Sequence, residues 1–157
     1  MRLTDYTDYS LRVLIYVAVH PDEPITIQQI SDAFDIPKNH LVKIVQNLGH
    51  RGYLLTMRGR SGGIRLGRPA IEINLREVVC ATEPDFGMVE CFRDGNRCVI
   101  TRACGLRGIL HQALQAYLDV LGGYTLQDLV EKPAAINRSL ALGIPVAGIR
   151  PASHKSR

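Results

Sequence analysis

Three cysteines in the middle of the chain have the residue type and the spacing to hold a metal or a metal cluster. Six residues separate Cys91 from Cys98, and five separate Cys98 from Cys104. The intervening segment is short and polar and contains a glycine, so it is predicted to be a loop that ends at the start of a helix. Thiolates select zinc, copper(I) or iron–sulfur clusters. The spacing therefore predicts a soft-metal site in this loop.

Three thiolates leave a four-coordinate metal one ligand short. His111, seven residues beyond Cys104, would complete a zinc site with three cysteines and one histidine. The spacings are unlike the two-residue knuckles of structural zinc, whereas the spacings of iron–sulfur ligands vary widely between families. A redox switch through a disulfide is a further alternative. Cys80 lies in an amphipathic stretch and is predicted to serve as a small hydrophobic residue outside the site.

The charge distribution predicts a polyanionic partner. The net charge is +4 and the pI about 9.0. Residues 36–71 contain seven lysines and arginines and no acidic residue, which is the electrostatic signature of nucleic-acid binding. A basic face that is merely solvated is the alternative interpretation.

A helix-turn-helix is predicted inside and just before this basic window. Thr26 and Gln29 form a capping-box pattern that starts a helix ending near Phe34. Pro37 suits the first position of a second helix, and Gly52 suits its termination. Two short helices joined by a tight turn form a DNA-reading unit. Its predicted DNA contacts are Gln28, Lys38, Asn39, His40 and Lys43.

A β-hairpin is predicted directly after the second helix of this unit, which is called the reading helix because it carries most of the predicted DNA contacts. Residues 53–57 and 64–66 are rich in strand-forming side chains, and a glycine-rich loop joins them. Such a hairpin is a wing, and arginines at its tip suit a narrow minor groove. The alternative is a plain hairpin whose glycines serve only the turn. The predicted wing contacts with DNA are Arg58, Arg60 and Ser61.

Two further helices are predicted to organise the rest of the molecule. Residues 4–20 are apolar on nearly every side, with a stripe at Leu11, Leu14, Ile15 and Ala18, so this helix should be buried. From residue 105 an apolar stripe continues for four helical turns, which predicts a dimerisation helix that packs against a second subunit. Packing within one chain is the alternative. The stripe consists of Leu106, Ile109, Leu110, Ala113, Leu114, Tyr117, Leu118 and Leu121.

The expected fold class is therefore mainly α with a small β-hairpin wing. A winged helix-turn-helix DNA-binding domain should cover residues 1–73, and a linker helix with the cysteine loop should cover residues 74–104. The dimerisation helix and a short terminal helix should cover residues 105–132. Residues 133–157 show no periodic pattern of apolar residues and contain no Asp or Glu, so a flexible basic tail is expected there.

The composition excludes several classes of protein. Apolar runs fall short of the roughly 20 residues of a membrane span, and no signal-peptide pattern precedes the first helix. We therefore expect a cytoplasmic protein without a membrane partner, in which cysteines are more often metal ligands than disulfides. No Cys-x-x-Cys motif, phosphate loop or nucleophile–base pair is present, so we do not expect an enzyme.

Several motifs resemble those of the winged-helix repressors that carry an iron–sulfur cluster, and the NsrR type in particular. The resemblance covers about residues 1–130, and the motifs occur in the same order. They are Leu3-Thr4, Thr7-Asp8-Tyr9, Leu11-Arg12, Leu41-Val42-Lys43-Ile44-Val45, Arg58-Gly59, Gly62-Gly63-Ile64, Glu90-Cys91-Phe92, Cys98-Val99-Ile100, Cys104-Gly105-Leu106 and Tyr124-Thr125-Leu126-Gln127-Asp128-Leu129.

The resemblance implies an iron–sulfur cluster, 2Fe–2S or 4Fe–4S, held by Cys91, Cys98 and Cys104. It implies a homodimer that binds double-stranded DNA at a palindromic operator, and nitric oxide as the signal whose reaction with the cluster releases the DNA.

The sister regulator of cluster assembly has a histidine where this chain has Arg107. In the NsrR type an acidic residue from the other subunit serves instead, and Asp8 occupies that position; its alternative role is a carboxylate that favours the helix start. A regulator of iron, redox state or cluster supply and a zinc-stabilised winged-helix regulator are the alternative functions.

Overall fold

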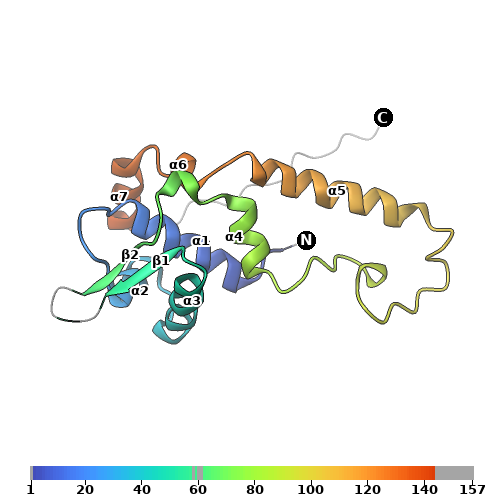
Figure 1. The fold of residues 1–157 in the computed structure, drawn as a ribbon, viewed down its shortest axis with the longest axis horizontal. Helices are drawn as coiled ribbons and strands as arrows, with labels where there is room; N and C mark the ends of the chain where they lie inside the picture. The colour runs from blue at the N-terminus through green and yellow to red at the C-terminus, as the bar shows by residue number, and fades with distance from the viewer. Residues whose placement is uncertain (1, 58, 60–61, 144–157) are drawn as a thin grey trace.

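The computed structural model describes residues 2–57, 59 and 62–143. Figure 1 shows a compact helical head from which one long helix projects as an arm. The expected fold class is confirmed, because helices dominate and two short strands form one antiparallel hairpin. The helices are α1 (Asp5–Ala18), α2 (Ile27–Phe34), α3 (Lys38–His50), α4 (Leu75–Thr82), α5 (Gly105–Gly122), α6 (Leu126–Leu129) and α7 (Pro133–Leu142), the strands are β1 (Leu54–Met57) and β2 (Gly63–Leu66), and short 3-10 turns form η1 (Ala70–Glu72) and η2 (Glu90–Phe92).

Local capping sets the ends of the helices. The Thr26 hydroxyl and the Gln29 side chain form the predicted capping box of α2, and Asn74 accepts hydrogen bonds from two amides at the start of α4. Past the end of α3, Gly52 has a φ of 74°, a left-handed conformation that a β-carbon would disfavour. The turn it makes leads directly into the hairpin, which pairs Leu54 with Leu66 and Met57 with Gly63.

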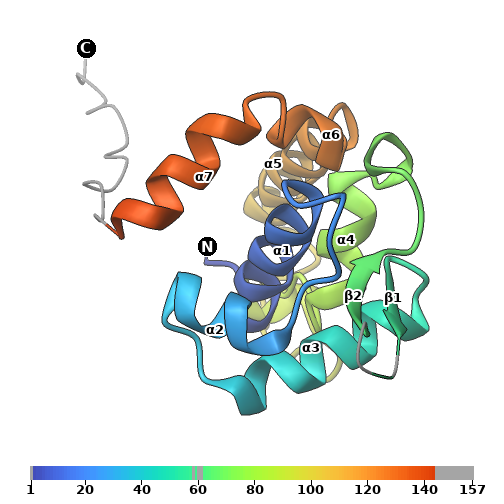
Figure 2. The same cartoon turned by 90° about the vertical axis from the view of Figure 1, so that its left-hand side faces the viewer.

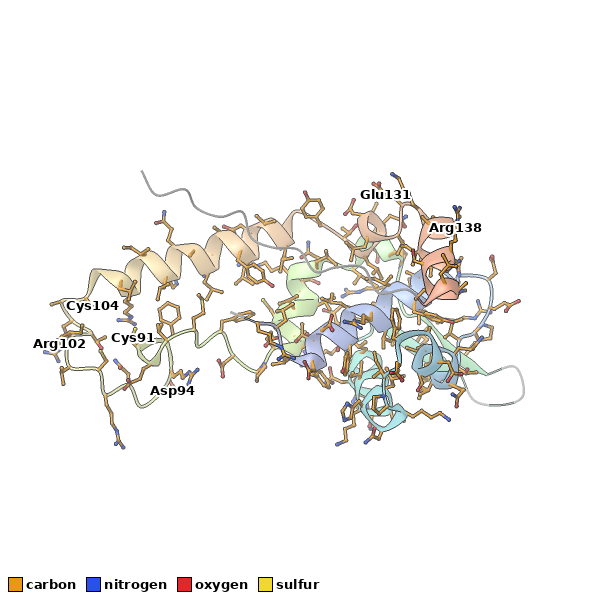
Figure 3. All side chains as sticks on the ribbon, turned by 180° about the vertical axis from the view of Figure 1, so that it is seen from behind. Cys91, Asp94, Arg102, Cys104, Glu131 and Arg138 are labelled. Carbon is orange, nitrogen blue, oxygen red and sulfur yellow. The ribbon has the colours of Figure 1, made fainter. Side chains whose placement is uncertain are left out.

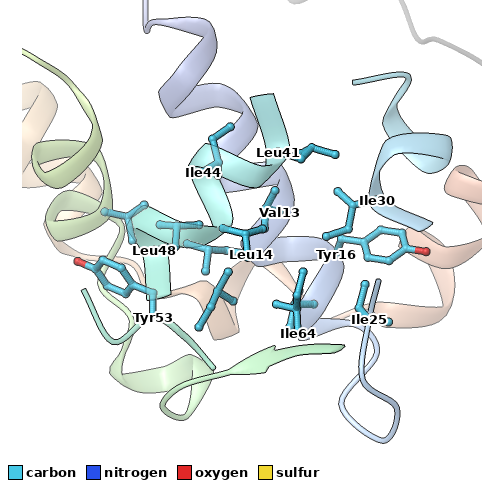
Figure 4. Close-up of a cluster of buried hydrophobic side chains, with 14 of the residues drawn as sticks. Val13, Leu14, Tyr16, Ile25, Ile30, Leu41, Ile44, Leu48, Tyr53 and Ile64 are labelled. Atoms are coloured by element: carbon cyan, nitrogen blue, oxygen red, sulfur yellow. The ribbon is translucent and has the colours of Figure 1, made fainter. Parts of the chain in front are cut away.

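The core of the head lies between α1, the helix-turn-helix and the hairpin (Figure 4). Leu14 of α1, Leu41 of α3 and Ile64 of β2 are among its fully or almost fully buried members. Burial of each such side chain contributes about 1.5–3 kcal/mol. The core therefore fixes α3 against α1 with its polar side facing outward.

The set of buried side chains on α1 differs in detail from the predicted apolar stripe. Leu14 is fully buried as expected, but Leu11, Ile15 and Ala18 are only partly covered. Val13 and Val17 are also deeply buried, as are the polar side chains of Thr7 and Ser10. α1 contacts α3, α4, α6 and β2, and Figure 2 shows it in the middle of these elements. A helix surrounded on several sides buries more than one stripe.

The predicted stripe of α5 is divided between two faces. Leu114 and Leu118 are buried, on the half of the helix that packs against α4. Leu106 and Ile109 remain exposed, at 55% and 65% of their surface. Among the described helices, α5 included, none is long and apolar enough to cross a membrane.

The expected flexible tail begins instead as a helix, so that prediction was wrong for its first ten residues. α7 occupies Pro133–Leu142, starts with a proline in its first turn and ends at Gly143 with a φ of 58°. Leu140 packs against the core, and α7 contacts α2. The sequence lacks a long periodic stripe here because only Ile136, Asn137 and Leu140 of this short helix are partly covered. Residues 144–157 lie outside the described part of the chain.

Candidate functional site

The cysteine loop lies at the far end of the arm, away from the helix-turn-helix. Figure 3 shows Cys91 and Cys104 at one end of the molecule, whereas Glu131 and Arg138 lie at the other. Cys91 is in the η2 turn, and Cys104 is the residue that precedes α5. The three loop cysteines are half-buried. The loop and α5 therefore form one unit that stands out from the head.

An open cavity of about 870 Å³ lies between the loop and α5 and brings together two of the three predicted ligands. Cys91 and Cys104 line its wall with His111, whose ring meets Phe92 edge-on at 6.3 Å. Cys98 does not line this cavity. Over residues 2–57, 59 and 62–143, no three side chains of His, Cys, Asp or Glu lie close enough together to hold a metal ion.

The donor set nevertheless fits a soft cofactor. All four cysteines are free thiols in this structure. Of the three loop cysteines, Cys91 and Cys104 line one cavity, and Cys98 lies in the loop that borders it. Thiolate donors on a short loop are the ligands that iron–sulfur clusters and zinc take. The residues that would hold such a group are Cys91, Cys98 and Cys104.

Polar contacts, rather than apolar packing, hold the loop around Cys98. Asn96 Oδ1 accepts the Cys98 amide at 3.0 Å, and its Nδ2 donates to Thr101 Oγ1 at 2.9 Å. Thr101 Oγ1 in turn donates to the Cys98 carbonyl at 2.7 Å. The neighbouring side chain of Val99 is 96% exposed. Hydrogen bonds therefore determine where the main chain of Cys98 lies.

Asp8 lies on α1 and does not line the cavity of the cysteine loop in its own chain. Its carboxylate is 2.6 Å from the guanidinium of Arg12, one helical turn further along. The same guanidinium lies over the ring of Tyr9 at 5.8 Å and over Phe34 of α2 at 5.9 Å. Asp8 is therefore connected to the helix-turn-helix through Arg12.

The predicted reading face is exposed. Lys38, Asn39, His40 and Lys43 project from α3 into solvent, while the opposite side of α3 is buried. Gln28 is exposed on α2 and donates to Asp32 at 2.5 Å. A helix that presents basic and amide side chains on one side can place them against phosphates and base edges.

The predicted wing contacts at Arg58, Arg60 and Ser61 lie outside the described residues. Other arginines of the basic window are engaged within the protein. Arg65 donates to the carbonyls of Pro21 and Asp22 at 3.0 and 3.1 Å, and Arg68 stacks on the ring of Tyr53 at 4.6 Å. Some of the positive charges in the basic window therefore belong to arginines that stabilise the protein's own fold.

Two features of the site were not predicted from the sequence. Tyr9 stacks on His40 with ring centroids 6.3 Å apart, so α1 supports the reading helix. A tyrosine pair at positions 6 and 9, one turn apart on α1, was the signal that could have indicated this. Cys80 is exposed and not a buried small residue as predicted. It lies near Tyr117, whose pKa is raised by burial first and then by the charges of Glu83 and Cys80.

Sequence comparisons match the chain to known regulators. Residues 3–132 match the family described as Rrf2, iron-dependent transcriptional regulator. The HTH-type transcriptional regulator NsrR of Bacillus subtilis is 52% identical over 144 residues, covering 90% of this chain and 99% of that protein. NsrR of Bacillus licheniformis is 50% identical over 143 residues, covering 90% and 100%.

Solved structures share the fold at low sequence identity. CymR of Staphylococcus aureus in its oxidised form has a TM-score of 0.67 and 23% identity, covering 83% of this chain and 97% of that chain. IscR of T. potens has a TM-score of 0.67 and 15% identity, covering 94% of each chain. These likenesses concern the arrangement of helices and hairpin.

Proposed function

The chain belongs to the Rrf2 family of transcriptional regulators, and we propose that it is a homodimeric repressor whose iron–sulfur cluster senses nitric oxide. It is not an enzyme, because its relatives are transcriptional regulators. The observation that carries the proposal is the loop with three free thiols at the end of the α5 arm. The name of the half-identical relatives, NsrR, supports the assignment of the signal.

The reading face and the exposed side of α5 support a dimer on DNA. Helical spacing places Leu106, Ile109, Ala113, Ala116 and Val120 along one side of α5, and all five are exposed. An apolar helix face of this length is ordinarily covered by a partner. Two copies joined here would present two α3 helices to a palindromic operator, whose half-sites lie about one turn of DNA apart.

Cys91, Cys98 and Cys104 would hold the cluster, with Asp8 of the partner subunit as the fourth ligand. A cluster of either the 2Fe–2S or the 4Fe–4S kind would supply iron that reacts directly with nitric oxide. The carboxylate is the harder and more exchangeable donor in this set. Its release would leave Asp8 to Arg12, the residue that already binds it within the chain.

The contacts of Arg12 and Tyr9 support a route from Asp8 to DNA. Arg12 lies over Phe34 of α2, and Tyr9 stacks on His40 of α3. A change in the position of Asp8 therefore acts on both helices of the reading unit. Two half-sites at a fixed spacing tolerate little rotation of either reading unit. A bound ligand that changes the orientation of these units therefore changes the affinity for DNA.

A spectroscopic titration tests the proposal. The chain, reconstituted without oxygen, should absorb visible light, and nitric oxide should bleach the absorption and lower affinity for an operator selected from random DNA at least tenfold. Cys98→Ser should abolish the absorption, whereas Cys80→Ser, a matched change outside the loop, should preserve it.

The other outcomes identify the alternatives. A colourless chain that holds one zinc would contradict the cluster. Operator release on iron removal or oxidation, without a response to nitric oxide, would instead support a regulator of iron, redox state or cluster supply.

A further inference from the structure

The carboxylate of Glu83 joins the base of the cysteine loop to the start of α1. Glu83 is the C-cap residue directly after α4, and the segment that leads to Cys91 begins behind it. Its Oε1 accepts the Thr4 amide at 2.8 Å and the Thr4 hydroxyl at 3.1 Å. These two hydrogen bonds span 79 residues of sequence, so they are a tertiary link and not a local turn.

Thr4 is the residue on which the first turn of α1 depends. It is the N-cap of α1, and its hydroxyl accepts the amide of Thr7 at 3.3 Å. Its carbonyl accepts the amide of Asp8 at 3.0 Å. Because a helix begins with amides that lack partners within the helix, Glu83 completes this cap from outside.

The loop base that carries Glu83 is itself tied to the segment after Cys91. Arg93 donates from Nε and Nη2 to the carbonyl of Gly87 at 3.0 and 2.8 Å, and Asp85 accepts the Gly87 amide at 2.6 Å. A β-carbon at Gly87 would come within 2.7 Å of Arg93 and 2.8 Å of Asp85. These contacts brace residues 85–93, the segment that follows Glu83 by one residue.

The start of α1 is likewise in contact with the reading helix. Tyr6 and Tyr9 of α1 and His40 and Lys43 of α3 line a common cavity of about 220 Å³. Tyr9 and His40 stack within it. A shift in the first turns of α1 therefore changes the support under two of the predicted DNA contacts.

We infer that Glu83 is a positioning residue that transmits the state of the cysteine loop to the reading helix within one subunit. Its contact with Thr4 joins the braced loop base to the helix that supports His40. This inference rests on the proposed function, and it differs from the route through Asp8, because Glu83 acts within its own chain and binds no cofactor. A chain of contacts shows energetic coupling only when a change at one site is measured to alter the other site. The test therefore changes the cysteine loop and measures the start of α1.

The test uses the cluster-free chain with Asp8→Ala, which removes the route through the partner subunit, and Cd²⁺ alone as a thiolate-binding probe. Amide hydrogen exchange of residues 4–9 is measured by mass spectrometry with and without Cd²⁺. Cd²⁺ should slow this exchange by about fivefold, the lower end of coupling effects between distant sites. Adding Glu83→Ala should remove the effect, whereas Glu83→Gln, which keeps an acceptor oxygen, should preserve it.

Glu77→Ala is the matched control. Glu77 is an exposed acid of α4 whose carboxylate pairs with Arg68 at 3.6 Å and not with Thr4. Its removal should therefore leave the Cd²⁺ effect intact. If Glu83→Ala lowers the helical circular dichroism, Glu83→Asp, shorter by one methylene, takes its place and should also remove the effect.

The outcomes separate this inference from the proposed function. No thiolate absorption on adding Cd²⁺ would contradict the cysteine site and, with it, the inference. Cd²⁺ binding without slower exchange at residues 4–9, or slowing that survives Glu83→Ala, would overturn the inference alone.

Discussion

At the scale of single residues, the proposed role of Asp8 as the fourth cluster ligand can be tested most directly. Asp8→Ala should shorten the lifetime of the cluster while leaving the cluster-free chain folded. The pair with Arg12 is exposed by more than a third at both side chains, and such an i,i+4 pair contributes only about 0.3–0.5 kcal/mol. The melting temperature should therefore change by about 1–2 °C. Anaerobic absorbance decay and circular dichroism measure the two quantities.

Asp5→Ala is the control at this scale, because Asp5 is also a carboxylate in the first turn of α1 and pairs with Arg2. It should leave the cluster lifetime unchanged. Equal lifetimes in Asp8→Ala and the parent would remove Asp8 from the ligand set and leave the fourth ligand to be sought elsewhere.

At the scale of elements, α5 serves two surfaces at once. One side packs Leu114 and Leu118 against the head, and the other exposes Ile109 and Val120, at 65% and 63% of their surface. Ile109→Asp should weaken the dimer, because an unpaired buried charge costs about 3–5 kcal/mol. That cost corresponds to association weaker on the order of a hundredfold or more. Analytical ultracentrifugation over a range of concentrations measures it.

Gln115→Asp places the same charge on the other side of α5 and should leave the association constant unchanged. A full dimer with Ile109→Asp would show that the exposed face of α5 is not the interface. The proposed homodimer would then need a different surface.

At the scale of the whole molecule, the basic side chains should make DNA affinity depend steeply on salt. A protein that neutralises six to ten phosphates loses on the order of 10³–10⁵ in affinity between about 50 and 200 mM salt. Lys43→Ala should lower the slope of log affinity against log salt by about one for each reading helix. Fluorescence anisotropy on a labelled operator measures this slope.

Lys132→Ala is the matched control, since Lys132 is an exposed lysine at the start of α7, outside the reading unit. It should leave the slope unchanged. An affinity indifferent to salt would contradict a role of the basic window in binding DNA.

Much of the head could be predicted from the sequence because its signals are local. The capping box at Thr26, the cap at Asn74 and the left-handed turn at Gly52 act within a few residues of themselves. The buried side of α3 likewise follows from spacing alone, since helical periodicity aligns Leu41, Ile44 and Leu48. The order of these elements was enough to indicate a winged helix, whereas the soft-metal site in the cysteine loop stays a prediction from spacing.

Only the tertiary structure decided which apolar surfaces are covered and by what. α1 buries several sides because four elements surround it, and α5 divides its stripe because α4 reaches only half of it. The exposure of Cys80, the helix α7 and the contact between Glu83 and Thr4 have the same origin. Each depends on a neighbour far away in the chain, and periodicity records that a face is apolar without recording its partner.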